Sequence, residues 1–489
     1  MSIIPLFVAI PLASAFLIPM FSKRIRVFSD IFANVTTFIL CVMSLGVIGR
    51  NAVYTVGLWK PPVGIAMALD GWSVLLLVTV NSISFCATVF SIKYMEQYTS
   101  KLRYYSLFLL MVAGMNGVVL SGDLFNLYVF LEIASIASYA LVGFGCQHDE
   151  LEASFKYLVL GSVASTFILL GVAVGYSLTG TLNMADISAR LPHDSSTFIF
   201  MASCFILGFG LKAALVPFHA WLPDAHPSAP APISAMLSGV LIKAIGVYAL
   251  IRLIFNIFGL TPVLSHILLF FGTASMVIGV FLAIGQWDMK RLFAYHSISQ
   301  IGYVMLGFGL ATPLGILGAI FHLMNHAVFK GLLFLTAGSV EYNIHTRQLE
   351  EMGGLRERMP VTGFTSLVAS MSIAGIPPLN GFWSKLIIII ACVQSGHYIF
   401  GLWAAFVSLM TLASFLKVQK FAFFGELKEH NKGVREVPVG MCLSMMILAL
   451  LCVGMGLLLV PSVRAQLLDP AVASLLRGTE YAAWILSKG

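Results

Sequence analysis

The sequence contains few charged residues. Only 10% of its 489 residues are Asp, Glu, Lys or Arg, whereas 59% are hydrophobic. Soluble domains carry about 25% charged residues, so this composition excludes a soluble enzyme, a disordered chain and a nucleic-acid-binding protein. A transmembrane helix needs roughly 20 apolar residues in a row. The composition therefore predicts an all-α polytopic membrane protein.

Motifs that bind metals, clusters or nucleotides are also missing. The seven cysteines are scattered and none lies in a CxxC pair, so neither an iron–sulfur cluster nor a zinc site is indicated. The chain contains no GxGxxG and no GxxxxGKS/T phosphate loop. We expect no cofactor, no metal and no redox chemistry of the chain's own. Energy for any transport must then come from partners, either redox subunits or an ion gradient.

Long apolar runs predict about fourteen transmembrane helices. Helices are expected because lipid offers the backbone no hydrogen-bond partner, and these runs do not alternate as barrel strands do. Pro217 and Pro223 flank the end of the seventh run, and Pro377 and Pro378 split the twelfth, which predicts broken helices 7 and 12. The runs are approximately Ser2–Phe21, Val27–Ile48, Trp72–Ile92, Tyr104–Leu120, Leu124–Phe144, Phe155–Tyr176, Phe198–Trp221, Ile233–Phe255, Val263–Ile284, Ala294–Leu310, Leu314–Ala337, Val361–Val393, Tyr398–Phe421 and Val439–Val460.

The basic residues predict the orientation of the chain. Fifteen of the 28 Lys and Arg residues lie in loops after odd-numbered runs, and seven lie on the other side. Under the positive-inside rule the odd loops are cytoplasmic and both termini lie outside. The fifteen are Lys23, Arg24, Arg26, Lys93, Lys101, Arg103, Lys290, Arg291, Arg347, Arg356, Arg358, Lys420, Lys428, Lys432 and Arg435; the seven are Arg50, Lys60, Arg190, Arg252, Arg464, Arg477 and Lys488.

Six lysines remain, and all fall within or at the ends of apolar runs: Lys156, Lys212, Lys243, Lys330, Lys385 and Lys417. One carboxylate, Glu132, also falls within an apolar run. A charge at the bilayer centre costs roughly 2.5–3.5 kcal/mol on insertion scales, so such residues are retained where they face a wet interior, pair or conduct ions. For Lys156 and Lys417 the alternative is a side chain that snorkels from a helix end. For Glu132 the alternative is an inert buried ion pair.

The spacing of these lysines indicates an internal repeat. The separations are 174 residues for Lys156 and Lys330, 173 for Lys212 and Lys385, and 174 for Lys243 and Lys417. A repeat of five helices, the fourth to eighth against the ninth to thirteenth, must be inverted because five is odd. The predicted parts are therefore a three-helix segment (1–103), a first five-helix repeat (104–257), a second, inverted repeat (258–421), and a last helix with a short amphipathic tail (422–489). The proline motifs of runs seven and twelve do not align at this offset.

Histidines accompany one of the buried lysines. His322, His326 and Lys330 are four residues apart, which places them on one face of a helix. A metal site is not expected because no third ligand accompanies the histidine pair. A proton relay is the favoured interpretation because histidine titrates near neutral pH, and the alternative is two core histidines bonded to carbonyl groups. His219, His226 and His296 receive no individual assignment.

Three segments carry a family resemblance: GDLFNLYVFLEIASIASYALVG, GFGLKAALVPFHAWLPDAHPSAPAPISAMLSGVLIKAIGVYAL and AGIPPLNGFWSK. They resemble the antiporter-like family, which contains proton-translocating subunits of respiratory complex I, their counterparts in membrane-bound hydrogenases, and the D and A subunits of Mrp cation/proton antiporters. The resemblance implies fourteen helices with two inverted five-helix units. It also implies roles by position: Glu132 and Lys212 as the pair on helices five and seven, Lys243 as the bridging residue of helix eight, Lys385 as the terminal lysine of helix twelve, and Lys156, His322, His326 and Lys330 in a central polar axis.

The resemblance also implies a function and a location. The segment WKPPVGIAMALDGWS and the chain length are closest to the Mrp D subunit and its hydrogenase-type relatives. We expect an ion-translocating subunit of a multi-subunit energy-converting complex in the inner membrane of a prokaryote, moving protons or exchanging cations for protons. The alternative is the D subunit of an Mrp-type Na⁺/H⁺ antiporter. The expected partners are other membrane subunits and lipid, without nucleic acid; a passive scaffold and a solute transporter are the competing classes.

Overall fold

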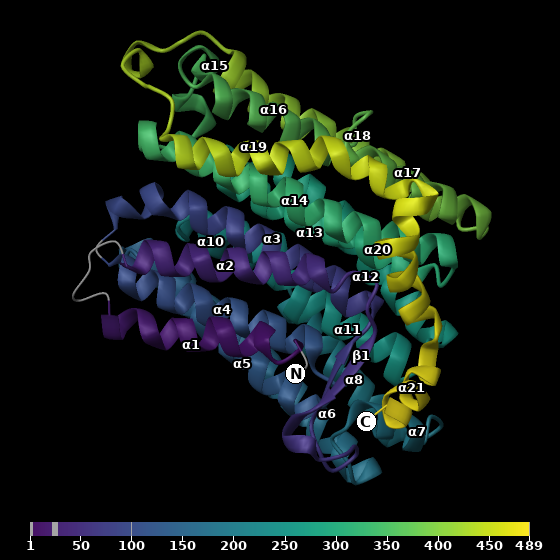
Figure 1. Ribbon diagram of the computed structural model, residues 1–489. Coiled ribbons are helices and arrows are strands. Elements are labelled where there is room, and N and C mark those ends of the chain that lie inside the picture. Colours follow the sequence, from purple (N-terminus) through teal and green to yellow (C-terminus); the bar gives the residue numbers. More distant parts are fainter. Residues whose placement is uncertain (1–2, 22–27, 99, 489) are drawn as a thin grey trace.

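A computed structural model describes residues 3–21, 28–98 and 100–488. Long helices run roughly side by side, and the yellow C-terminal helices cross one end of the bundle (Figure 1). Apart from one two-stranded hairpin, the described residues form helices and loops. The predicted run boundaries at Ser2 and Val27, and the loop cations Lys23, Arg24 and Arg26, lie outside the described residues.

The first half of the chain contains both strands. Its elements are α1 (Leu6–Phe21), α2 (Phe28–Gly46), β1 (Ala52–Thr55), η1 (Val56–Leu58), β2 (Ala66–Leu69), α3 (Gly71–Tyr94), η2 (Met95–Gln97), α4 (Lys101–Leu120), α5 (Leu124–Val142), α6 (His148–Thr179), α7 (Met184–Arg190), α8 (Ser196–Lys212), α9 (Leu222–Ser228), α10 (Ala231–Met236), η3 (Leu237–Tyr248), α11 (Ala249–Arg252) and η4 (Leu253–Ile257).

The second half consists of helices joined by short loops. Its elements are α12 (Pro262–Ile284), α13 (Met289–Gly309), α14 (Pro313–Ile344), η5 (Leu349–Glu351), α15 (Leu355–Arg358), α16 (Pro360–Ala374), α17 (Asn380–Gln394), α18 (Tyr398–Val418), η6 (Gln419–Phe424), η7 (Glu429–Asn431), α19 (Val439–Gly454), η8 (Met455–Leu459), α20 (Pro461–Leu476), η9 (Gly478–Glu480) and α21 (Tyr481–Lys488).

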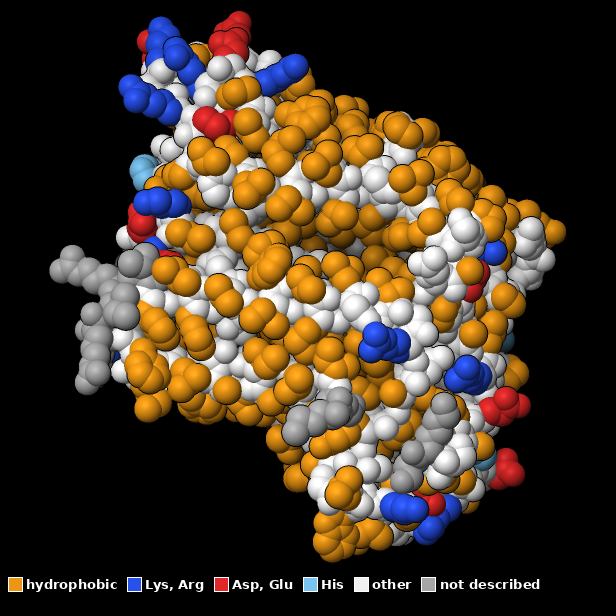
Figure 2. Space-filling model, viewed as in Figure 1, with side chains coloured by type: hydrophobic (Ala, Val, Ile, Leu, Met, Phe, Trp, Pro, Cys, Tyr) orange, Lys and Arg blue, Asp and Glu red, His pale blue; other side chains and the backbone are white. Residues whose placement is uncertain are grey.

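The helices have the length and surface of a membrane protein. Ten helices of the described part are long and apolar enough to cross a bilayer, and four further apolar helices are shorter. Apolar side chains cover the face over the long helices, while charged side chains gather towards the ends (Figure 2). These findings confirm the predicted all-α membrane fold. The count of fourteen spans and the inverted repeat stay predictions.

Two predicted breaks are present, although the first lies earlier than predicted. The seventh run does not continue as a helix to Trp221, because α8 ends at Lys212 and a turn leads to α9. In the twelfth run α16 ends at Ala374 and α17 begins at Asn380, beyond the two prolines. Proline has no backbone N–H to donate, so each break leaves helix-end carbonyl groups available to other donors.

The centre of the bundle is made by two helices. Every residue of 231–257 is buried, and so is every residue of α14 from Gly315 to Val340. The segment 231–257 is irregular: η3 and η4 are π-helical, a feature that the apolar pattern did not predict. Both helices carry charged side chains, which a wholly apolar environment does not favour.

One end of the bundle is covered by segments distant in sequence. The strands β1 and β2 pair antiparallel with Ala52 opposite Leu69, and the C-terminal α20 and α21 pack against α3 and α7. In Figure 1 the C-terminal helices pass from the end of α19 down across the ends of the other helices. The predicted amphipathic tail is therefore a pair of helices that joins the last part of the chain to the first.

Candidate functional site

Glu132 and Lys212 form a loose ion pair between α5 and the last residue of α8. The distance from Lys212 Nζ to Glu132 Oε1 is 3.9 Å, and the lysine side chain is 1% exposed. The ammonium group donates to Ser135 Oγ at 3.0 Å and to Tyr139 Oη at 3.1 Å, while Ser165 Oγ donates to Glu132. The lysine is thus held mainly by hydroxyl groups, and its carboxylate partner is within reach without a direct hydrogen bond.

Lys243 lies on the π-helical segment η3 and is fully buried. Its ammonium group donates to the backbone carbonyl of Ser238, and no ion pair to it occurs among the described residues. The segment packs tightly against the end of α8, since a Cβ added at Gly246 would lie 2.6 Å from the Ala213 nitrogen. Lys243 is therefore a cation without a counter-ion, on a helix that contacts the turn after Lys212.

His322, His326 and Lys330 share one face of α14, and all three are fully buried. The two imidazole rings are 6.3 Å apart between centroids. His322 Nδ1 lies 2.9 Å from Ser384 Oγ on α17, and Lys330 donates to the carbonyl of Phe293 on α13. Neither nitrogen of His326 has a hydrogen-bond partner among the described protein groups. This face can therefore accept and donate further hydrogen bonds.

Lys385 lies next to the break between α16 and α17. Its ammonium group donates to the carbonyl of Ile373 at 2.7 Å and to Ser408 Oγ on α18 at 3.4 Å. The carbonyl belongs to the last turn of α16, where no later turn of that helix supplies a donor. The ammonium group also lies 4.9 Å from the centre of the Tyr303 ring. The break thus supplies the polar group that holds this buried cation.

Electrostatic interactions connect most of these residues. Lys243 repels positive charge on Lys330 and on His326, and Lys385 repels positive charge on His322. No hydrogen bond or ion pair joins Lys212 to Lys243 in the described part of the chain. Nor do any three His, Cys, Asp or Glu side chains of that part form a group that could hold a metal ion.

Lys156 lies apart from this row, which corrects its expected place in a central axis. Its side chain is 47% exposed and pairs with Glu152 at 2.7 Å and with Asp224 at 3.1 Å. The N-terminal part of a long helix can extend beyond the apolar layer of the membrane. The apolar residues next to Lys156 in the sequence therefore did not decide whether its side chain is buried. Lys417 donates to two carbonyls near the end of α12, at 2.6 and 2.7 Å, and does not join the row either.

The structure buries further polar residues that had received no assignment from the sequence. His226 on α9 is fully buried and neither ring nitrogen has a hydrogen-bond partner among the described groups. His296 bonds Ser414 Oγ at 2.9 Å through Nε2, and the side chain of Gln300, one turn further along α13, has no partner in the described part. Each of these residues is a lone titratable or amide side chain next to or within an apolar run. Such a side chain is costly in a membrane unless it has a role, so its presence in the sequence was the available signal.

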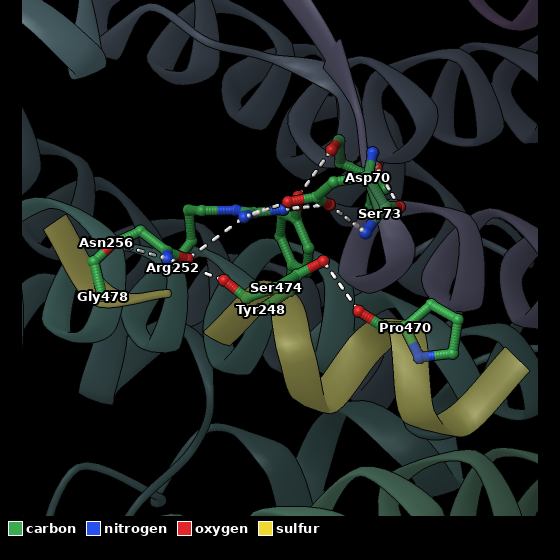
Figure 3. A network of polar contacts seen from close by, with 9 residues as sticks. Asp70, Ser73, Tyr248, Arg252, Asn256, Pro470, Ser474 and Gly478 are labelled. Carbon is green, nitrogen blue, oxygen red and sulfur yellow. Dashed lines mark hydrogen bonds and ion pairs between the residues drawn. The ribbon is translucent and has the colours of Figure 1, made fainter. Parts of the chain in front are cut away.

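A second charged network lies at the end of the bundle covered by the C-terminal helices (Figure 3). Arg252, counted in the sequence with the seven basic residues of the outer side, is 2% exposed and contacts both oxygens of Asp70, at 2.6 and 2.7 Å. It also donates to Tyr248 Oη at 2.9 Å and to Asn256 Oδ1 at 3.1 Å. The Tyr481 ring of α21 lies 4.9 Å from the guanidinium. Both terminal nitrogens of this guanidinium are thus hydrogen-bonded, and its charge is paired with a carboxylate.

The fold and the buried row define a class: integral membrane proteins in which titratable side chains lie inside the helix bundle. The particular family follows from comparison with known proteins. Residues 121–411 match the family described as NADH:quinone oxidoreductase/Mrp antiporter, TM, and residues 60–105 match NADH-ubiquinone oxidoreductase (complex I), chain 5 N-terminus. The chain belongs to this antiporter-like family, which confirms the resemblance found in the sequence.

Three relatives show how far the similarity extends. The chain is 36% identical over 430 residues to the D subunit of the Na⁺/H⁺ antiporter of Alkalihalophilus pseudofirmus, covering 86% of this chain and 87% of the relative. It superposes on a chain of the Mrp complex from Dietzia sp. DQ12-45-1b with a TM-score of 0.92 at 29% identity, covering 99% of both. A chain of the membrane-bound sulfane sulfur reductase, an archaeal respiratory membrane complex, gives a TM-score of 0.92 at 30% identity, covering 99% and 100%. The structural neighbours are thus chains of multi-subunit membrane complexes.

Proposed function

We propose that this chain moves protons across the membrane as an antiporter-like subunit of a multi-subunit energy-converting complex. The proposal is carried by three buried lysines, Lys243, Lys330 and Lys385, whose hydrogen-bond partners within the described part of the chain are only backbone carbonyls or hydroxyls. A buried cation without a counter-ion is costly, and giving up a proton removes that cost. The same groups can therefore take up and release protons inside the bundle.

The pair of Glu132 and Lys212 is the proposed switch. At an effective dielectric constant near 20, two unit charges about 4 Å apart interact by about 4 kcal/mol, and these groups are 3.9 Å apart. Opening or closing the pair would change the balance of two conformations by a large factor, since about 5.5 kcal/mol moves a two-state equilibrium from 1:99 to 99:1. The hydroxyl groups around Lys212 provide alternative partners when the pair opens.

The row from Lys243 to Lys385 is the proposed path. A proton would pass from Lys243 along Lys330, His326 and His322 and reach Lys385 beside the break of α16 and α17. At that break the last carbonyl groups of α16 accept from Lys385 and Ser408, and irregular backbone is tolerated at membrane depth only where it is buried in protein or lines a water-filled cavity. We further propose that the odd loops face the cytoplasm, that both termini lie outside, and that the membrane is the inner membrane of a prokaryote.

Proton pumping by the assembled complex tests this proposal. Glu132→Gln and Lys212→Ala are expected to reduce pumping strongly while the complex still assembles, because each removes one member of the switch. Lys417→Gln is the matched control, since it removes a lysine outside the row. Near wild-type pumping in both switch variants would discard the scheme, and loss of assembly with normal pumping in assembled mutants would favour a passive scaffold.

A second candidate is the D subunit of an Mrp-type Na⁺/H⁺ antiporter. The similarity to the Alkalihalophilus protein and to the Dietzia complex supports it, whereas the similarity to the sulfane sulfur reductase supports a redox-driven complex. Sodium-dependent proton flux in vesicles without an electron donor would favour the antiporter. Flux that requires ferredoxin, hydrogen or NADH would favour redox subunits as partners.

A further inference from the structure

An apolar groove of about 410 Å³ opens on the side of the bundle, between the ends of α2 and α19. Both helices pack against α3, which forms the floor of the groove together with the central helix α14. Figure 2 shows the surface hollowed between the regions that cover α2 and α19. We call this space the α2–α19 groove, and its walls include Leu45, Ile48, Ile83, Met324, Val328 and Leu451.

The α2–α19 groove runs along the helices. At one end its walls are Ile48, just after α2, and Leu467 of α20, the helix that crosses that end of the bundle. At the other end it reaches Ile83, which is twelve residues after the start of α3 at Gly71. Twelve residues of helix span about 18 Å at about 1.5 Å for each residue. The groove therefore extends from one end of the bundle to more than half of the roughly 30 Å of a bilayer core.

The surroundings of the groove are those of a membrane-facing surface. The helices α2 and α19 are both long and apolar enough to cross a bilayer. Leu45 of α2 and Leu451 of α19 are exposed at the edges of the groove. Exposed apolar helices at membrane depth contact lipid tails, because no water is present there. The groove is thus open to lipid along its length.

The volume of the groove selects its occupant. An apolar cavity of about 150 Å³ binds one benzene molecule, which has six carbons. At the same packing, about 410 Å³ has room for a chain of roughly sixteen carbons. One turn of an α-helix, about 10 Å wide and 5.4 Å long, already fills about 420 Å³. A transmembrane helix of a neighbouring subunit therefore does not fit into the groove, whereas a single acyl chain does.

Arginines lie at the end of the groove where a lipid headgroup would lie. Arg50 is exposed and follows the wall residue Ile48 by two positions. Arg464 precedes the wall residue Leu467 by three positions and pairs with Asp469 at 3.0 Å. A guanidinium group binds phosphate through two parallel hydrogen bonds. Arg50 is therefore the cation available to a phosphate group at this end.

The floor of the groove belongs to the helix that carries the histidines. Met324 and Val328 lie two positions before His326 and Lys330. Two residues turn an α-helix by about 200°, so the groove reaches the side of α14 opposite the polar side chains. An occupied groove would keep water from that side of the helix.

We propose that the α2–α19 groove binds one acyl chain of a membrane phospholipid, with the lipid phosphate at Arg50. The chain fills the space behind α14 and completes the apolar wall between the polar row and the bilayer. Binding involves no covalent step. The inference does not depend on the proposed function, since it rests on the depth, volume and charge of the groove.

A photoactivatable phospholipid tests the site. Native lipid of the assembled complex is exchanged in detergent for phosphatidylglycerol with a diazirine near the end of one acyl chain. The complex is irradiated in vesicles of this lipid, and its labelled peptides are sequenced. Label is expected on residues 324–328 of α14 as well as on exposed helix faces. Because Met324 and Val328 are buried from bulk lipid, absence of label on these residues in the wild type would overturn the proposal.

A variant that fills the groove gives the second test. Gly454 lines the groove, and a Cβ at this position would have no heavy atom within 4 Å. Its φ of −80° suits any residue, so Gly454→Phe can extend its ring into the open space. Label on residues 324–328 is expected to be lost, while exposed faces stay labelled. Leu450→Phe, at an exposed position of the same helix outside the groove walls, is the matched control and is expected to keep the wild-type pattern.

Two further results separate the possible occupants and the headgroup. Equal label on residues 324–328 in Gly454→Phe and Leu450→Phe would overturn the proposal. Loss of a neighbouring subunit from Gly454→Phe, with this label unchanged, would overturn it in favour of a protein side chain as the occupant. Arg50→Gln is expected to reduce the label on residues 324–328 severalfold, and unchanged label in this variant would overturn the place of the phosphate.

Discussion

Two cations on the same buried segment, Lys243 and Arg252, are held in opposite ways. Arg252 faces both oxygens of Asp70 and two further hydrogen-bond partners, and the Tyr481 ring covers its guanidinium (Figure 3). Among the residues that the structure describes, Lys243 has a single hydrogen-bond partner, a carbonyl on its own segment. Burial is complete or nearly so in both cases, so the difference lies in the partners and not in the depth.

The difference separates a charge that holds the fold from a charge that can move. A bidentate pair with a carboxylate fixes arginine in its charged form, and arginine does not lose its proton in proteins. A lone ammonium group in a buried site has no such restraint, and lysine readily changes protonation when buried. Arg252 therefore joins the strands and the C-terminal helices to the central segment, while Lys243, nine positions earlier, is available for proton exchange.

The largest expected effect comes from breaking the paired cation. Arg252→Ala leaves Asp70 buried without a partner, and removing one member of a buried pair costs about 3–5 kcal/mol. Folded protein in detergent is expected to fall sharply, measured as yield and as thermal unfolding. The double variant Asp70→Asn with Arg252→Met removes both charges and should recover part of the loss. If Arg252→Ala were as stable as the wild type, the contrast between a structural Arg252 and a mobile proton on Lys243 would be wrong.

The unpaired cation should give the reverse result. Lys243→Met keeps the length of the side chain and removes a charge that has no counter-ion, so the unfolding temperature is expected to stay equal or to rise. Proton flux in the assembled complex is expected to be lost. A variant that unfolds like Arg252→Ala would show that Lys243 has a structural role.

Lys212 should behave between these two extremes. Tyr139→Phe removes one of the two hydroxyl groups that accept from its ammonium, and leaving a buried donor short of a partner costs about 1–3 kcal/mol. The lysine then depends more on Glu132, so proton flux is expected to fall severalfold without loss of the fold. The control is Tyr157→Phe, which removes a hydroxyl group that accepts from Ser138 at 3.1 Å. Equal flux in Tyr139→Phe and Tyr157→Phe would contradict the role of the hydroxyl groups around Lys212.

The smallest effect is expected at Lys156. Its side chain is half exposed and its partners are one exposed and one partly buried carboxylate, and exposed pairs contribute little to stability. Lys156→Gln should therefore assemble and pump close to the wild-type rate. Strong loss of flux with normal assembly would return this residue to the transport path.

Much of the architecture could be predicted because the membrane restricts the choices. A backbone in lipid must bond to itself, so apolar runs predicted helices and paired prolines predicted the breaks. Spacing by four predicted that His322, His326 and Lys330 share one face. These properties depend on residues close together in the chain, which is why the sequence contained them.

The rest depended on contacts between distant segments. Lys156 and Lys243 both lie in apolar runs, yet one reaches surface carboxylates and the other has every side covered. Arg252 was counted with the basic residues of the outer side, although Asp70, 182 positions away, pairs with it inside the protein. The π-helical segment and the end of α8 at Lys212 were missed as well, because packing partners and not apolar content decide where a helix is distorted or stops.

The sequence by itself determined that the chain forms apolar helices, where two of them are interrupted, and which titratable groups lie among them. Only the tertiary structure decided which of those groups are paired and which are alone, and it buried His226 without a hydrogen-bond partner for its ring among the described groups. The physical reason is that the free energy of a buried charge depends on the groups within a few ångströms of it. Those groups come from other helices, and folding alone brings them together.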